Sequence, residues 1–155
     1  MKYSRLTKEQ FEELHQEFIN FLATQSITAE EWSDIKANKP EVAEQELDVF
    51  SDLVWEGVLN KAKYIEHISA QQMHLFHLEA KSIRLIALKL KNTQDLTTKS
   101  GYQWLRENLL SDDVELFQAN KDYSEDANLD KFKLIQQGGV ITKGDLFNYF
   151  DDIIG

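Results

Sequence analysis

The most constraining feature of this sequence is a long stretch after its single proline in which apolar residues recur with helical spacing. The apolar positions lie three and four residues apart, as on one face of an α-helix: Ala43, Leu47, Phe50, Val54, Val58, Ala62 and Ile65. Pro40 suits the first position of such a helix, because its missing N–H would have no partner there. The pattern predicts one long helix over about 40–67, the main element of the fold.

Shorter helices are predicted ahead of this long one. Thr7 and Gln10 fit a capping box, in which the Thr7 hydroxyl accepts from the Gln10 backbone and the Gln10 side chain reaches back. The apolar residues that follow recur at helical steps and predict a helix over about 8–24. Thr28 begins a similar signature, which predicts a short helix that ends before Pro40.

Residues 73–91 have a pattern that favours strands. Two β-compatible runs, 73–78 and 83–90, are separated by the polar segment 79–82 and predict an antiparallel hairpin. Apolar residues occupy both odd and even positions, so we expect other elements to cover both faces. A helix over 70–80 fits the same residues and stays open as an alternative.

The rest of the chain, residues 92–155, alternates between helical and polar stretches. A strand at about 114–118 would extend the hairpin into a small sheet. Helices are predicted near 98–110, near 126–137 and from about 142 onward. The sequence as a whole predicts an α+β fold of N-terminal helices, a central antiparallel hairpin or small sheet and C-terminal helices, in a single domain over 1–155.

Charge is distributed unevenly along the chain, whose 155 residues carry a net charge of −10. Residues 1–60 carry −8, residues 61–106 carry +5 and residues 107–155 carry −7. The overall negative charge disfavours binding to bulk nucleic acid or to an anionic membrane surface. We expect a cytoplasmic protein with a protein partner and no membrane association, and the pattern is compatible with a homo-oligomer.

Catalytic and cofactor motifs are absent from the sequence. Without cysteine there is no disulfide, thiolate nucleophile or cysteine-based zinc or iron–sulfur site. No glycine-rich nucleotide loop, nucleophile elbow or zinc-protease motif occurs. Adjacent acids such as Asp112 and Asp113 point apart rather than across a cleft. These observations favour a non-enzymatic protein with no cofactor.

One central cluster contains metal-capable residue types: His67, His74, His77 and Glu79. Residues three apart point to opposite faces of a strand, so His74 and His77 would meet at one ion only if their segment were helical. A metal-binding protein or metal-dependent hydrolase that uses this cluster is the first alternative function.

The basic segment 61–106 suggests a second alternative, RNA binding. Its cations could contact phosphates beside Tyr64 and Phe76, unless the chain's own acids neutralise them: Lys61, Lys63, Lys81, Arg84, Lys89, Lys91 and Lys99.

Aromatic and arginine side chains are the candidates for contacts with a protein partner. Tryptophan and arginine commonly anchor interfaces, which makes Trp32, Trp55 and Arg84 the predicted partner-binding residues. Core packing is the competing explanation for the tryptophans, since each lies among apolar neighbours at helical spacing.

Three stretches of the sequence together resemble a known type of protein family. They are Leu6–Glu9 through Ile27–Trp32, Phe50–Leu59 through Tyr64–His67, and Phe132–Gly138. With them the chain resembles an uncharacterised bacterial family of short cytoplasmic proteins, a domain of unknown function. The resemblance implies one intact domain and no assigned active site. The leading functional hypothesis is therefore a non-enzymatic interaction domain, such as an adaptor, regulator or immunity-like protein, that presents acidic helical surfaces to a partner.

Overall fold

The long helix that follows the proline is α4 (Pro40–Lys61) in a computed structural model that describes residues 1–155. Its start is as predicted, but it ends at Lys61 rather than near residue 67. Residues Tyr64–Ile68 form strand β1, in which Ile65 is buried in the sheet core. The predicted end was wrong because Ile65 continues the helical spacing by coincidence, while its burial comes from strand pairing.

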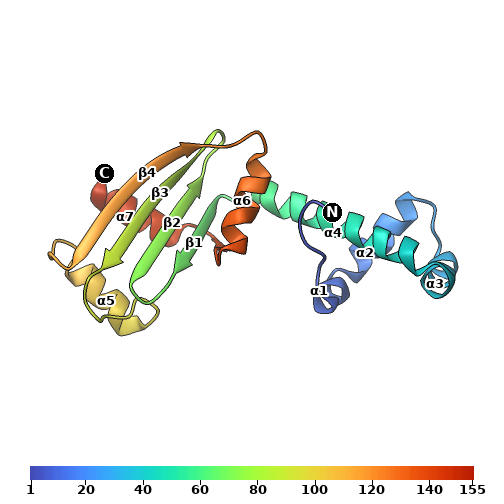
Figure 1. The fold of residues 1–155 in the computed structure, drawn as a ribbon, viewed down its shortest axis with the longest axis horizontal. Coiled ribbons are helices and arrows are strands. Elements are labelled where there is room, and N and C mark those ends of the chain that lie inside the picture. The colour runs from blue at the N-terminus through green and yellow to red at the C-terminus, as the bar shows by residue number, and fades with distance from the viewer. The chain divides into compact units, whose positions relative to one another are not determined.

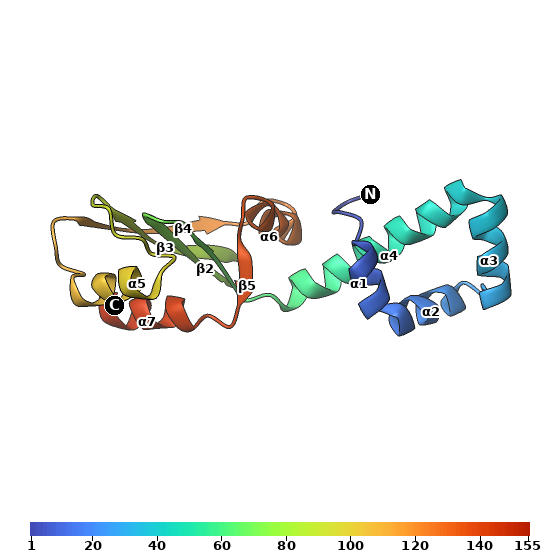
Figure 2. The same cartoon turned by 90° about the horizontal axis from the view of Figure 1, so that it is seen from below.

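The chain divides into two compact units, Met1–Asn60 and Lys61–Gly155. The first is built from helices, and the second contains the sheet with three helices (Figures 1 and 2). The α+β fold class is confirmed. The single domain over 1–155 stays a prediction.

The helical unit consists of α1 (Lys8–Glu13), α2 (His15–Thr24), α3 (Ala29–Asn38) and α4. The predicted capping box is present, with the Gln10 N–H donating to Thr7 Oγ1 at 3.2 Å. The predicted helix over 8–24 is interrupted at Leu14, which separates α1 from α2. Phe18 and Phe50 lie at the centre of the unit, with ring centroids 5.1 Å apart in an edge-on contact.

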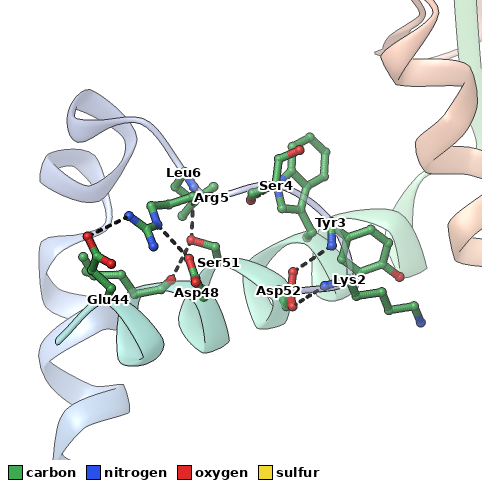
Figure 3. A network of polar contacts seen from close by, with 11 residues as sticks. Lys2, Tyr3, Ser4, Arg5, Leu6, Glu44, Asp48, Ser51 and Asp52 are labelled. Carbon is green, nitrogen blue, oxygen red and sulfur yellow. Dashed lines mark hydrogen bonds and ion pairs between the residues drawn. The ribbon is translucent and has the colours of Figure 1, made fainter. Parts of the chain in front are cut away.

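Hydrogen bonds fix the first residues of the chain along α4 (Figure 3). Asp52 accepts from the backbone N–H groups of Lys2 at 2.8 Å and Tyr3 at 2.9 Å. The buried Ser51 hydroxyl accepts from the Leu6 N–H at 3.0 Å and donates to a carbonyl one turn earlier in α4. These hydrogen bonds satisfy backbone N–H groups of a segment that has no regular secondary structure. The Leu6 side chain can therefore pack in the core of the helical unit.

The sheet unit contains five antiparallel strands in the order β4-β3-β2-β1-β5. The strands new to this description are β2 (Gln72–Leu78), β3 (Ser82–Leu90), β4 (Val114–Asp122) and β5 (Val140–Thr142). The predicted hairpin is confirmed as β2 and β3, so the alternative helix over 70–80 is wrong. The strand predicted at 114–118 is confirmed and extends to Asp122.

Helices cover the two faces of the sheet unequally. Helices α5 (Lys99–Glu107) and α7 (Asp145–Ile154) lie on one face, and α6 (Ala127–Gln136) lies on the other (Figure 2). The first face forms the larger core, in which Phe150 packs among strand and α5 residues. On the second face α6 packs over Ile65 and Leu78 only at one end. The three predicted C-terminal helices are thus confirmed, and part of the second face has no helix over it.

Candidate functional site

The sheet brings two of the four candidate metal ligands together. His67 of β1 lies directly opposite His74 of β2, with ring centroids 6.3 Å apart. His77 points to the other face, where it stacks on Tyr64 at 4.6 Å and lies 5.3 Å from Phe147. This separation follows from the alternation of side chains along β2. No group of three or more His, Asp or Glu side chains in the structure has an arrangement that could hold a metal ion.

Burial lowers the pKa of His74 below its ordinary value of 6.5, and the charge of His67 lowers it further. The folded protein therefore binds a proton at His74 more weakly than the unfolded chain does. The contribution of His74 to stability is fully present above pH 6.5 and is lost as the pH falls toward the lower pKa of the folded state.

We expect His74→Gln to reduce the loss of unfolding free energy that wild type shows between about pH 7.5 and about pH 5.5. His67→Gln is the matched variant and should reduce it less, because it removes only the neighbouring charge. Urea unfolding at a series of pH values measures both effects. Glu66, whose pKa is raised by burial and by Asp145, is present in all three proteins. Its effect therefore cancels when the pH dependence of a variant is subtracted from that of wild type. Equal pH dependence in all three proteins would contradict this account.

The fourth candidate ligand, Glu79, lies beside Arg84 at the end of the β2–β3 hairpin. The Arg84 Nε is 3.9 Å from Glu79 Oε1, and its guanidinium donates to both oxygens of Asp151 in α7, at 2.8 and 3.4 Å. The Asp151 carboxylate raises the pKa of Arg84, and Arg84 lowers the pKa of Asp151. Arg84 also lies 5.3 Å from the Phe147 ring centroid. Arg84, which the sequence predicts to bind a partner, therefore links the β2–β3 hairpin to α7 in the structure.

The two tryptophans predicted to bind a partner have different surroundings, both within the helical unit. Trp55 donates from Nε1 to the Ser4 carbonyl at 3.0 Å. Trp32 packs edge-on against Phe18 at 5.3 Å, and Lys36 Nζ lies 5.8 Å from its ring centroid. Trp55 thus helps to hold the N-terminal segment, whereas Trp32 remains half-buried at the edge of an open hollow.

That hollow is an apolar groove of about 830 Å³ in the helical unit. Side chains from α1, α2, α3 and α4 line it, together with Arg5 and Leu6 ahead of α1 and Ile27 between α2 and α3. Its apolar lining includes Phe11, Phe18, Ile19, Leu22, Ile27, Trp32 and Leu47. A volume of this size is in the range that accommodates a drug-sized ligand or several side chains of a peptide. We refer to it as the helical groove.

Three of the five Lys and Arg residues of the helical unit line this groove. Arg5 is engaged by acids, since its Nε lies 2.7 Å from Asp48 and its Nη1 lies 4.0 Å from Glu44. Lys36 lies over Trp32, and Lys8 is exposed at the start of α1. The groove therefore combines an apolar floor with a partly neutralised basic margin.

A model of one protein family matches the chain over residues 1–155. The chain belongs to DUF6495, a family of unknown function. The resemblance inferred from the sequence to a domain of unknown function is confirmed by this match. No curated protein and no solved structure matches the chain. Membership of DUF6495 assigns no chemistry to the groove or to the histidine pair.

The two units of this DUF6495 chain carry very different net charges. The totals for the three sequence segments do not show this, because two of those segments belong to one unit. Residues 1–60 carry −8, while residues 61–155 carry twelve basic and fourteen acidic side chains and so only −2. The basic middle and the acidic C-terminal segment belong to one unit, where Arg84 pairs with Asp151 and Lys91 Nζ lies 3.3 Å from Glu115. Most of the excess negative charge therefore belongs to the helical unit. No helix of this DUF6495 chain is both long and apolar enough to cross a membrane.

The helical groove was not anticipated from the DUF6495 sequence. Phe11, Phe18 and Leu22 are among the apolar residues whose helical spacing predicts the helix over 8–24, and this spacing indicates one buried face but no opening above it. A usable signal was Ile19, an apolar residue next to Phe18 that lies off the buried face and lines the groove. A helix with apolar residues on two sides often contacts two partners.

Proposed function

We propose that the protein is a non-enzymatic interaction protein, acting as an adaptor, regulator or immunity-like protein, whose helical unit binds a basic protein partner. The partner inserts the apolar face of a helix into the helical groove. The predicted cytoplasmic location is part of this proposal.

The observation that carries the proposal is the helical groove itself. It is open, lined largely by apolar and aromatic side chains, and contains Trp32, one of the residues singled out from the sequence. An amphipathic helix in a hydrophobic groove is a common mode of peptide recognition. Half-buried tryptophan is also among the residues that most often dominate the binding energy of an interface.

The charge of the helical unit supports a basic partner. Its net charge of −8 attracts a basic protein and accelerates association. The cations along the groove restrict where the partner's charges lie. We expect the inserted segment to be apolar in its middle, with its basic residues outside the groove and facing the surrounding acids.

We expect Ile19→Asp to abolish capture of this partner from a lysate of the source cells. Ile19 lines the groove and is 43% exposed, so the new carboxylate would enter the contact without disturbing a buried core. Affinity capture with wild-type and variant baits, followed by mass spectrometry, measures the loss. Raising the salt concentration should weaken capture by wild type, because long-range attraction is screened.

Val49→Asp is the matched control. Val49 is 51% exposed on α4 and is not part of the groove lining, and the substitution changes the charge by the same amount. A protein retained by wild type and Val49→Asp but lost with Ile19→Asp supports the proposal. The same set of captured proteins with all three baits would contradict it.

Metal binding and RNA binding stay predictions. Of the four candidate metal ligands, only His67 and His74 face each other. In the basic segment, Arg84 is paired with Asp151 and Lys91 with Glu115. Neither observation favours these alternatives over the groove.

A further inference from the structure

The outer strand β4 carries the charged residues Glu115, Lys121 and Asp122 but lacks the other devices that protect a free edge. It lies at one edge of the sheet (Figure 1). It is nine residues long, and eight of its side chains are exposed. It pairs with β3 without interruption from Val114 to Asp122, so no bulge twists it away. Neither a proline nor a covering helix blocks its outer side. Natural proteins usually protect a long free edge in one of these ways.

The outward backbone groups of β4 can be identified from the hydrogen bonds at its two ends. The Asp113 carbonyl accepts from Lys91 at 2.8 Å, and the Tyr123 N–H donates to the Lys81 carbonyl at 3.4 Å. Odd-numbered residues therefore direct their backbone groups toward β3. Because the direction alternates along a strand, even-numbered residues from Leu116 to Asp122 direct theirs outward. At Val114 the N–H already donates to the Ser111 carbonyl at 3.1 Å, which leaves only its carbonyl for a partner.

We propose that β4 pairs antiparallel with β4 of a second copy of this chain, about a two-fold axis at Gln118. In this register each of the nine residues of β4 lies opposite a residue of the second copy, and outward residues meet outward residues. Gln118 faces Gln118 of the second copy, which forms the hydrogen-bonded pair on the axis. The two five-stranded sheets then join into one ten-stranded sheet through a self-complementary contact.

Charge complementarity selects this register and this occupant. Pairing about Gln118 places Glu115 opposite Lys121 of the second copy, and symmetry repeats the pair on the other side of the axis. Opposite charges at directly facing positions stabilise a strand pair, whereas like charges destabilise it. Glu115 already lies 3.3 Å from Lys91 of its own chain, so the new contact would place a cation on each side of it.

Apolar contacts reinforce the pairing on the face that α6 leaves open. Phe117 is 60% exposed and would lie opposite Ala119 of the second copy. The small alanine leaves room for the ring, and the two Phe117 rings approach diagonally across the axis. Aromatic side chains reach such diagonal neighbours in antiparallel sheets. This interface lies in the sheet unit and is independent of the helical groove.

The test uses the absence of cysteine from the chain. We expect Gln118→Cys to form a disulfide-linked dimer under mild oxidation, because its Cα atoms on the axis would lie about 5.5 Å apart, within disulfide range. Asn120→Cys is the matched control, on the same strand and face. Its two Cα atoms would be about 14 Å apart and cannot be bridged.

Non-reducing electrophoresis measures the dimer fraction of each full-length variant, and sedimentation of the wild-type chain measures association without a cross-link. Dimer in Gln118→Cys well above that in Asn120→Cys, with concentration-dependent dimerisation of wild type, is the expected result. Equal cross-linking of both variants, no cross-linking of Gln118→Cys, or a wild-type monomer at every concentration overturns the proposal. Circular dichroism verifies that both exposed substitutions leave the fold intact.

Discussion

Phe150→Ala should destabilise the sheet unit by about 3–5 kcal/mol, the range for truncating a buried phenylalanine. Phe150 of α7 is fully buried and contacts the Tyr149 ring edge-on at 5.0 Å. It packs in the core that joins α7 to α5 and the sheet, together with Leu105. The substitution removes the ring contacts and leaves a cavity that rigid neighbouring strands fill poorly. The loss is a large share of the 5–15 kcal/mol that stabilises a typical domain.

Ile153→Ala in the same helix is the control for this prediction. Ile153 is an exposed side chain, so its truncation should change stability by only about 0.5 kcal/mol. Amide hydrogen exchange of the sheet unit measures both variants, because it reports opening free energies for separate parts of a chain. Similar exchange in both variants would show that α7 is not packed into the core.

Gly101→Ala should destabilise the sheet unit by about 3 kcal/mol. A Cβ atom at Gly101 would lie 1.7 Å from the backbone oxygen of Asp95, so the loop ahead of α5 must move. That oxygen accepts from the Thr98 hydroxyl at 2.7 Å, and the same hydroxyl accepts from the Gly101 N–H at 3.0 Å. Moving Asp95 therefore also disrupts the N-cap of α5. Urea unfolding followed by circular dichroism measures the loss.

Gly57→Ala makes the same chemical change with the opposite expected sign. Gly57 lies inside α4 and has no atom within 4 Å of the position that a Cβ would occupy. Alanine at such a site should stabilise the helix by about 0.5–1 kcal/mol, since glycine is less favourable in a helix interior. If Gly101→Ala lowered the free energy of unfolding no more than Gly57→Ala does, α5 would not pack as closely against its preceding loop as the structure shows.

Most helices and the central hairpin could be predicted because their signals are local. The Thr7 capping box, Pro40 and the apolar period of α4 each depend on residues a few positions apart. Strands β1 and β5 escaped prediction because their identity depends on distant partners. Val140 to Thr142 is too short to show a pattern, and it becomes a strand only by pairing with β1. The second half of β4, residues 118–122, is mostly polar and therefore shows no apolar alternation.

The candidate site was less predictable than the fold. The alternation of side chains along a strand correctly predicts that His74 and His77 point to opposite faces. That His67 lies opposite His74 could not be predicted, because it depends on the register between β1 and β2. The sequence pointed to Arg84 as a contact for a partner, and the structure shows the guanidinium bound to Asp151. Nothing local to Arg84 reveals an acid 67 residues away. Grooves and ion pairs of this kind arise from tertiary packing, which residue spacing does not encode.

The antiparallel pairing of β1 with β5 has a consequence for the order in which the chain acquires structure. Tyr64 faces Thr142, so the sheet cannot be completed until residues from opposite ends of the second unit have met. Such non-local pairing requires closure of long loops and slows folding. The internal contacts of the helical unit join residues that are no more than sixty positions apart. During synthesis we therefore expect the helices of residues 1–60 to assemble early, while the strands remain exposed to misassociation until α7 is available.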